Sequence, residues 1–90
     1  MHQALLIIIG RVQGVAFRYS ARKKAISLGL SGYAKNLPDG TVESLIQGRK
    51  ETIRRYIDWC KKGGPQSAEV KDVKVSWQRA SCKIEDFEVL

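Results

Sequence analysis

The chain has 90 residues and a mass of 10.1 kDa, enough for one small domain but not for two independent hydrophobic cores. Hydrophobic residues make up 43% and charged residues 28%, which excludes a wholly disordered chain. The longest apolar run, Ala4–Ile9, is far shorter than the roughly 20 residues of a membrane-spanning helix. No cationic segment precedes it, so a secretory signal is not indicated. We expect a single domain over residues 1–90 with no membrane partner.

The net charge is strongly basic and uneven along the chain. Sixteen Lys and Arg against nine Asp and Glu give +7, and residues 1–40 alone carry six basic and one acidic side chain. Such a domain attracts anions, which include nucleic acid, an acidic membrane and a small phosphorylated molecule. Two cysteines, Cys60 and Cys82, are too few for a disulfide framework and lack metal-type spacing. They indicate free thiols in a reducing, cytoplasmic compartment, with one disulfide as the alternative.

The first third of the chain predicts a strand, a loop and a helix. An Ile-rich run over Gln3–Val12 is typical of a buried central strand, and Arg11–Ala16 then forms a loop between two glycines. A helix over Phe17–Leu28 follows, with Gly29 at its C-terminal cap. Its apolar stripe consists of Phe17, Ala21, Ala25 and Leu28.

The rest of the chain predicts a hairpin, a second helix and two strands. Strands over Gly32–Asn36 and Thr41–Gln47 flank a turn that contains Asp-Gly, the strongest short hairpin signal. A helix over Glu51–Lys62 ends at a Gly-Gly-Pro sequence, and its apolar face includes Tyr56 and Cys60, both predicted to lie in the core. The last two strands are predicted over Val70–Trp77, with Trp77 in the core, and over Phe87–Leu90.

The order of these elements is β-α-β-β-α-β with a short terminal strand. It predicts an α+β fold, the ferredoxin-like split βαβ sandwich, with two helices on one face of a mainly antiparallel sheet. The alternative is a small mixed sheet with another strand order. Since a strand–helix–strand crossover leaves its two strands parallel, the segment Gly10–Arg18 and residue Asn36 are expected at the same sheet edge. Lys35 then lies on the opposite strand face from Asn36.

The segment Gly10–Arg18, GRVQGVAFR, has features of an anion site. Glycines permit positive φ, and a strongly bent loop before a helix can direct several N–H groups into one concavity. Arg18, in the first helical turn, can present a planar fork to two phosphate oxygens. No Gly-Lys-Ser/Thr follows, so this is not a nucleotide P-loop. From these residues alone, a phosphate site and an ordinary turn with a solvated arginine both remain open.

The same nine residues closely resemble the first signature of the acylphosphatase family, Gly-x-Val-Gln-Gly-Val-x-Phe-Arg. Residues 32–43, GYAKNLPDGTVE, resemble the second signature, with Tyr33 where many members carry Trp or Phe. Residues 64–70, GPQSAEV, are similar to the Gly-Pro-x-x-Ala-x-Val segment that follows the second helix in this family. The closing residues 87–89, FEV, also match the family pattern. The resemblance therefore spans essentially the whole chain.

This resemblance implies a small cytosolic hydrolase that cleaves acyl phosphates and releases inorganic phosphate. A monomer is the default expectation. It implies that Asn36 orients the attacking water and that the loop amides, together with the arginine, hold the phosphoryl group. The residues so assigned to substrate binding are Val12, Gln13, Gly14, Val15, Ala16 and Arg18. No metal or cofactor is expected, because acidic residues are sparse before Asp39. A Ser–His or Cys–His nucleophile is not expected either, because the only histidine is the terminal His2.

An RNA-binding module is the alternative from another functional class, because RNA-recognition domains share this strand order and are often basic. Those domains stack bases on aromatic side chains of the central strands, whereas Leu5–Ile9 and 41–46 contain none. We therefore expect no nucleic-acid partner. A closer alternative is the acylphosphatase-like domain of hydrogenase-maturation carbamoyltransferases, which are long chains.

Overall fold

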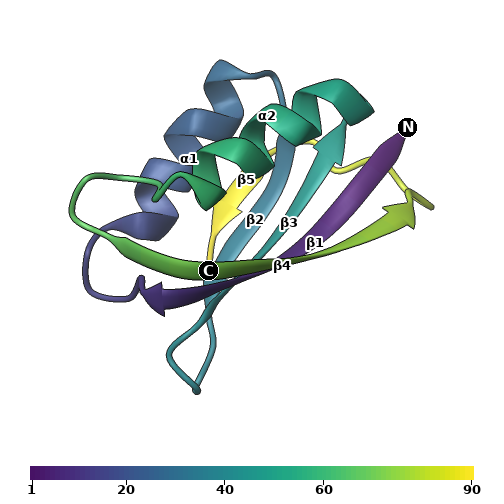
Figure 1. Cartoon of the computed structure of the whole chain (residues 1–90). Helices are drawn as coiled ribbons and strands as arrows, with labels where there is room; N and C mark the ends of the chain where they lie inside the picture. The colour runs from purple at the N-terminus through teal and green to yellow at the C-terminus, as the bar shows by residue number, and fades with distance from the viewer.

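In the computed structural model, which describes residues 1–90, two helices cover one face of a five-stranded sheet (Figure 1). The elements are β1 (His2–Arg11), α1 (Phe17–Ser27), β2 (Ser31–Asn36), β3 (Val42–Gly48), α2 (Lys50–Lys61), β4 (Glu69–Arg79) and β5 (Phe87–Val89). The strand order is β4-β1-β3-β2-β5, antiparallel except for the parallel pair of β2 and β5. The predicted α+β ferredoxin-like fold is confirmed. Neither helix combines the length and the apolar character that crossing a membrane requires.

Strand alternation determines which side chains form the core. Ala4, Leu6 and Ile8 of β1 point toward the helices and are fully buried. Most of the predicted stripe of α1 (Phe17, Ala21 and Ala25) is buried in the same core, and α1 lies over β2 and β5. The same core includes the predicted residues of α2, which are Ile53, Tyr56, Ile57 and Cys60. One continuous hydrophobic cluster therefore joins both helices to the sheet.

The strand β4 is longer than its hydrophobic pattern predicts, and Trp77 does not lie in the core. The pairing of β4 with β1 runs from Arg79 opposite His2 to Glu69 opposite Arg11, so backbone hydrogen bonds extend the strand at both ends. Trp77 shares the helix-covered face of β4, yet its side chain is 41% exposed. Strand alternation predicts which face of the sheet a side chain lies on, but not whether other residues cover that side chain. Because β4 is an edge strand with a neighbour on one side only, its side chains are covered less than those of the central strands.

The two cysteines are expected to differ in reactivity. Cys60 is fully buried, and this burial raises the pKa of its thiol to about 12, whereas Cys82 is exposed. Because the thiolate is the reactive form, a thiol reagent at mildly alkaline pH should titrate only Cys82 in the native protein and both thiols in denaturant. Rapid reaction of both thiols without denaturant would contradict the burial of Cys60.

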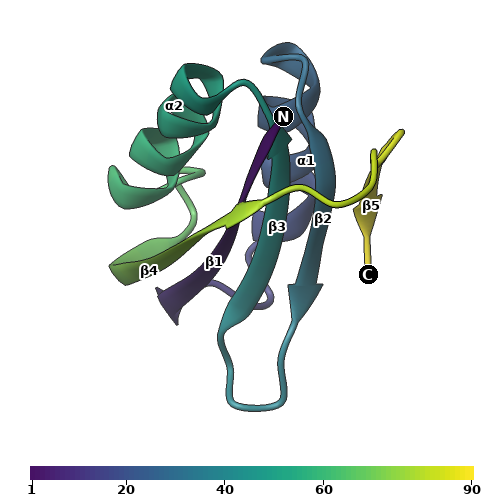
Figure 2. The ribbon, with the colours of Figure 1, turned by 90° about the vertical axis from the view of Figure 1, so that its right-hand side faces the viewer.

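The segment after β1 and the end of β2 lie at the same end of the sheet, which is the edge formed by the strand ends. Val42 of β3 pairs with Ile8 on one side and with Asn36 on the other, so Asn36 lies level with a residue just before Gly10. Figure 2 shows the connection from β1 to α1 and the hairpin between β2 and β3 at one end of the sheet, with the N-terminus at the other. The predicted convergence of Gly10–Arg18 with Asn36 at one edge is therefore observed.

Candidate active site

A bulge at the end of β1 starts the loop. The register of β1 against β4 shifts between Ile9 and Gly10, and Gly10 has φ of 138°. A Cβ atom at this glycine would lie 2.1 Å from the carbonyl oxygen of Glu69, so only glycine allows the two strands to approach this closely. The bulge directs the chain out of the sheet and into the loop.

The loop curls and leaves its backbone donors free. Gly14 has a φ of 75°. Ala16, directly before α1, has a φ of 59° and is the only residue other than glycine with a positive φ in the chain. None of the backbone N–H groups of residues 12–16 donates a hydrogen bond within the protein. The first N–H groups of α1 also lack intrahelical acceptors, as at every helix start. Such a row of donors suits an anion.

Side-chain hydrogen bonds fix this loop from two sides. Gln13 Nε2 donates to the carbonyl oxygens of Leu37 at 2.8 Å and Thr41 at 2.9 Å, both in the hairpin that follows Asn36. On the other side, Ser67 Oγ donates to the carbonyl oxygen of Val15 at 2.8 Å. The family resemblance implies a backbone role for Gln13, but no local sequence pattern predicts the hydrogen bonds that its side chain makes.

Arg18 is half-buried in the first turn of α1 and is held against the end of the chain. Its Nη1 donates to the carbonyl oxygen of Leu90 at 2.6 Å, and the Leu90 N–H donates to the carbonyl oxygen of Ala34 at 2.8 Å. The guanidinium carbon lies 5.8 Å from the centroid of the Tyr19 ring. The bond to Leu90 is the only hydrogen bond that the Arg18 side chain makes in the protein, so most of its five N–H donors remain available. The contact with Leu90 was not predicted.

Asn36 presents an unpaired acceptor at the same edge. It follows Ala34 by two residues, so both face the helices, while Lys35 is exposed on the opposite face as predicted. The Oδ1 atom of Asn36 is buried and has no hydrogen-bond partner in the protein. Buried polar atoms are normally paired, so an unpaired one is a place for a bound water or substrate atom. The chain of contacts from Arg18 through Leu90 to Ala34 brings the guanidinium to the strand that carries Asn36.

The nearby carboxylate of Glu43 is engaged on the other face of the sheet. It accepts a hydrogen bond from the Tyr33 hydroxyl at 2.6 Å. Burial, together with the hydrogen bond to Glu43 and the charge of that residue, raises the pKa of Tyr33 to about 12. No three His, Cys, Asp or Glu side chains lie close enough together to hold a metal ion. The groups that the edge offers are thus amide donors, one guanidinium and one carboxamide.

Comparisons with known proteins agree with these features. Residues 4–89 match the acylphosphatase family. The chain is 48% identical over 77 residues to the acylphosphatase of Thermus thermophilus, covering 86% of each chain. It is 44% identical over 90 residues to that of Dehalococcoides mccartyi, covering 99% of this chain and 98% of the relative. The crystal structure of the Bacillus subtilis acylphosphatase superposes with a TM-score of 0.93 at 34% identity, over 100% of this chain and 99% of that one.

Proposed function

Because this chain belongs to the acylphosphatase family, whose members hydrolyse acyl phosphates to a carboxylate and inorganic phosphate, we propose that three parts of the site divide this reaction between them. The amides of residues 12–16 and the guanidinium of Arg18 bind the phosphoryl group, and the carboxamide of Asn36 positions the attacking water. The observation that carries this assignment is the row of loop amides with no acceptor in the protein beside a half-buried arginine. Preorganised donors of this kind stabilise the charge of a transferring phosphoryl group.

The chemistry needs little from the protein beyond charge and position. Water forms a bond to phosphorus, the bond between phosphorus and the acyl oxygen breaks, and the carboxylate departs with the electron pair. This leaving group is stable without a proton, so neither a general acid nor a protein nucleophile is required. We propose that a phosphate oxygen of the substrate accepts the proton of the water. The only histidine, His2, begins the strand that ends at the loop, which keeps its imidazole away from the site.

The first experiment compares two leaving groups. Benzoyl phosphate is expected to be hydrolysed rapidly and p-nitrophenyl phosphate little, because the site has no acid or nucleophile for an ester. EDTA is expected to leave the rate unchanged. The measurement is kcat/KM for each substrate with the same enzyme preparation. Equal values for the two substrates would contradict the proposed division of roles, and a sharp step in rate near the pKa of histidine, about 6.5, would do the same.

We further propose that the enzyme acts as a cytoplasmic monomer without a nucleic-acid or membrane partner. Its two cysteines are free, as in a reducing compartment. The face of β1 and β3 that the helices leave open carries aliphatic side chains such as Leu5, Ile7 and Leu45 rather than aromatic rings on which bases stack.

Gln13 is proposed to keep the loop and Asn36 in a fixed relation. Since its side chain joins the loop to the carbonyls of Leu37 and Thr41, Gln13→Ala should let the hairpin shift relative to the loop. Misplacement of about 1 Å can cost up to about 10²-fold in rate. We expect kcat to fall by about 10-fold or more, with the inhibition constant of inorganic phosphate nearly unchanged.

The matched control for this variant is Ser67→Ala, which removes a hydrogen bond to Val15 on the side of the loop away from the hairpin. It is expected to lower kcat less than Gln13→Ala does. If phosphate binding weakens in Gln13→Ala in proportion to the loss of kcat, the side chain shapes the loop itself and does not set its distance from Asn36.

A further inference from the structure

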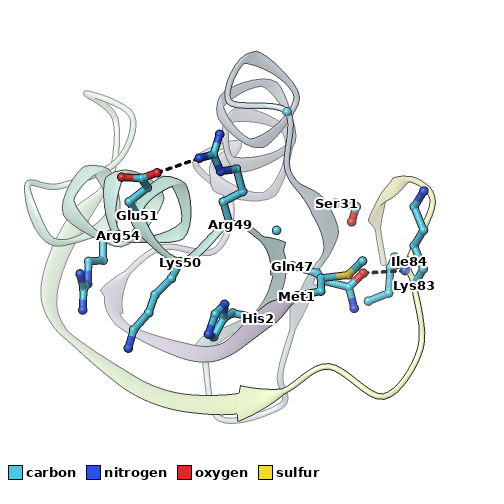
Figure 3. Close-up of a pocket in the computed structure, with 12 residues that line it drawn as sticks. Met1, His2, Ser31, Gln47, Arg49, Lys50, Glu51, Arg54, Lys83 and Ile84 are labelled. Atoms are coloured by element: carbon cyan, nitrogen blue, oxygen red, sulfur yellow. Dashed lines mark hydrogen bonds and ion pairs between the residues drawn. The ribbon is translucent and has the colours of Figure 1, made fainter.

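A basic pocket of about 710 Å³ lies at the end of the sheet away from the Gly10–Arg18 loop (Figure 3). It is formed where β1 and β2 begin, β3 ends and α2 begins, together with residues 83 and 84. The ten residues of β1 separate the two ends by roughly 30 Å, at about 3.3 Å per residue. A volume of this size is within the range of small-molecule sites, about 300–1,000 Å³. The pocket is therefore separate from the proposed active site.

The charged side chains that line the pocket are mainly cationic. The residues with a permanent positive charge are Arg49, Lys50, Arg54 and Lys83. The single carboxylate among the lining residues is Glu51, which lies 3.2 Å from the Arg49 guanidinium in the only ion pair of the molecule. Three cations are thus left without an acidic partner. Like charges gathered around one hollow repel one another, and a bound anion relieves this repulsion.

The cations stand on two sides of the pocket. Figure 3 shows Lys50 and Arg54 on the side formed by α2, whereas Lys83 stands on the opposite side, on the segment that crosses the sheet. The Lys50 Nζ atom lies 5.6 Å from the centroid of the Trp77 ring, which is partly exposed beside the pocket. An anion that reaches the cations on both sides must therefore be elongated, with charges along its length.

The side of the pocket that carries Lys83 is held to the sheet by a buried side chain. Gln47 is 2% exposed, and its Nε2 donates to the carbonyl oxygen of Cys82 at 2.7 Å. Its Oε1 accepts a hydrogen bond from the Ile84 N–H at 2.7 Å. Because both neighbours of Lys83 are bound to the same glutamine, the backbone that presents this lysine is fixed. This side of the pocket therefore needs little backbone ordering when a ligand binds, which lowers the entropic cost of binding.

We propose that this pocket binds a chain of linked phosphate groups, the chemistry that inorganic polyphosphate and nucleoside triphosphates share. One end of the chain pairs with Lys50 and Arg54, and the other end pairs with Lys83. A second binding site is thereby assigned to the enzyme, independent of acyl phosphate hydrolysis. Trp77 offers a ring on which a nucleobase stacks if the chain belongs to a nucleotide.

The test is calorimetric titration with inorganic tripolyphosphate at low ionic strength, without divalent cations, in an Arg18→Ala background that weakens the active site. Adding Arg54→Gln and Lys83→Gln should weaken binding at least ~10-fold, because two charge-assisted contacts are lost. The control pair, Lys62→Gln and Lys74→Gln, removes the same charge at exposed positions outside the pocket and should weaken binding less than ~2-fold. With Arg18 intact, the pocket pair should hydrolyse benzoyl phosphate at the normal rate, which shows that it folds.

Two further measurements show where the tripolyphosphate binds and whether the ligand is a free polyphosphate or a nucleotide. In the same Arg18→Ala background, tripolyphosphate should shift the amide resonances of residues 48–54 and 83 at lower concentrations than those of residues 10–18. Equal affinity for ATP and tripolyphosphate identifies the phosphate chain alone as the ligand, and tighter binding of ATP that is lost in Trp77→Ala identifies a nucleotide. Absence of binding, equal weakening by both pairs of substitutions, or shifts confined to residues 10–18 would overturn the proposal.

Discussion

Replacing Arg18 with alanine is expected to lower kcat/KM for benzoyl phosphate by about 10²–10³-fold, the usual cost of removing one preorganised donor from a charge-stabilising site. The loss should appear mostly as weaker binding of the phosphoryl group, since the guanidinium is the only cationic group among the residues assigned to substrate binding. It should therefore raise the inhibition constant of inorganic phosphate as well. Kinetics on benzoyl phosphate and phosphate inhibition measure both effects.

Arg18→Lys should fail to restore this activity. Lysine supplies the charge but not the planar pair of N–H donors that matches two phosphate oxygens. The matched control is Arg22→Ala, one turn further along α1, because Arg22 Nε also donates to a carbonyl oxygen near the chain end, that of Phe87 at 3.3 Å. This control removes the same charge and a similar contact and should leave kcat/KM within about threefold of the unmodified enzyme. Near-normal activity of Arg18→Lys would refute the assigned role.

The sequence predicts the parts of the site that depend on chain topology. The spacing of apolar residues gives a strand before the loop and a helix after it, and the crossover rule brings Gly10–Arg18 and Asn36 to one edge, as the structure has them. Alternation correctly separates Lys35 from Asn36. These features follow from backbone periodicity and handedness, which local sequence determines.

Contacts between distant side chains and backbone atoms were not predictable in the same way. The two acceptors of the Gln13 side chain are 24 and 28 residues away in the sequence. The acceptor of Arg18, the carbonyl oxygen of Leu90, is 72 residues away. No periodicity encodes such pairs, because they depend on side-chain direction after the sheet has formed. The exposure of Trp77 is a similar case, since the alternation of β4 is correct but nothing covers the ring fully.

These long-range contacts have a common consequence for the site. They hold the backbone on each side of Asn36, at Ala34 through Leu90 and at Leu37 through Gln13, while the Oδ1 atom of the carboxamide accepts no hydrogen bond from the protein. An unpaired buried acceptor normally costs about 1–3 kcal/mol. The fold thus keeps a polar atom free by fixing its neighbours, as the proposed role of Asn36 in positioning a water requires.

Replacing Asn36 with alanine is therefore expected to abolish turnover of benzoyl phosphate without destabilising the protein. Because Oδ1 has no partner in the protein, its removal breaks no internal hydrogen bond, and the free energy of unfolding should stay within about 1 kcal/mol of its original value. Inorganic phosphate should still inhibit competitively any residual activity and still bind in titration, since the loop amides and Arg18 remain. Denaturant unfolding and phosphate titration measure the two expectations separately.

Asn36→Asp is the sharper companion variant. It keeps the size and shape of the side chain but places a carboxylate beside a phosphate dianion, so like-charge repulsion should weaken phosphate binding that Asn36→Ala leaves intact. If Asn36 positions only the water, the alanine variant loses kcat alone, whereas the aspartate variant loses kcat and phosphate affinity together. Loss of phosphate binding and of unfolding stability in Asn36→Ala would instead mean that the carboxamide supports the loop, and the role in positioning the water would have to be abandoned.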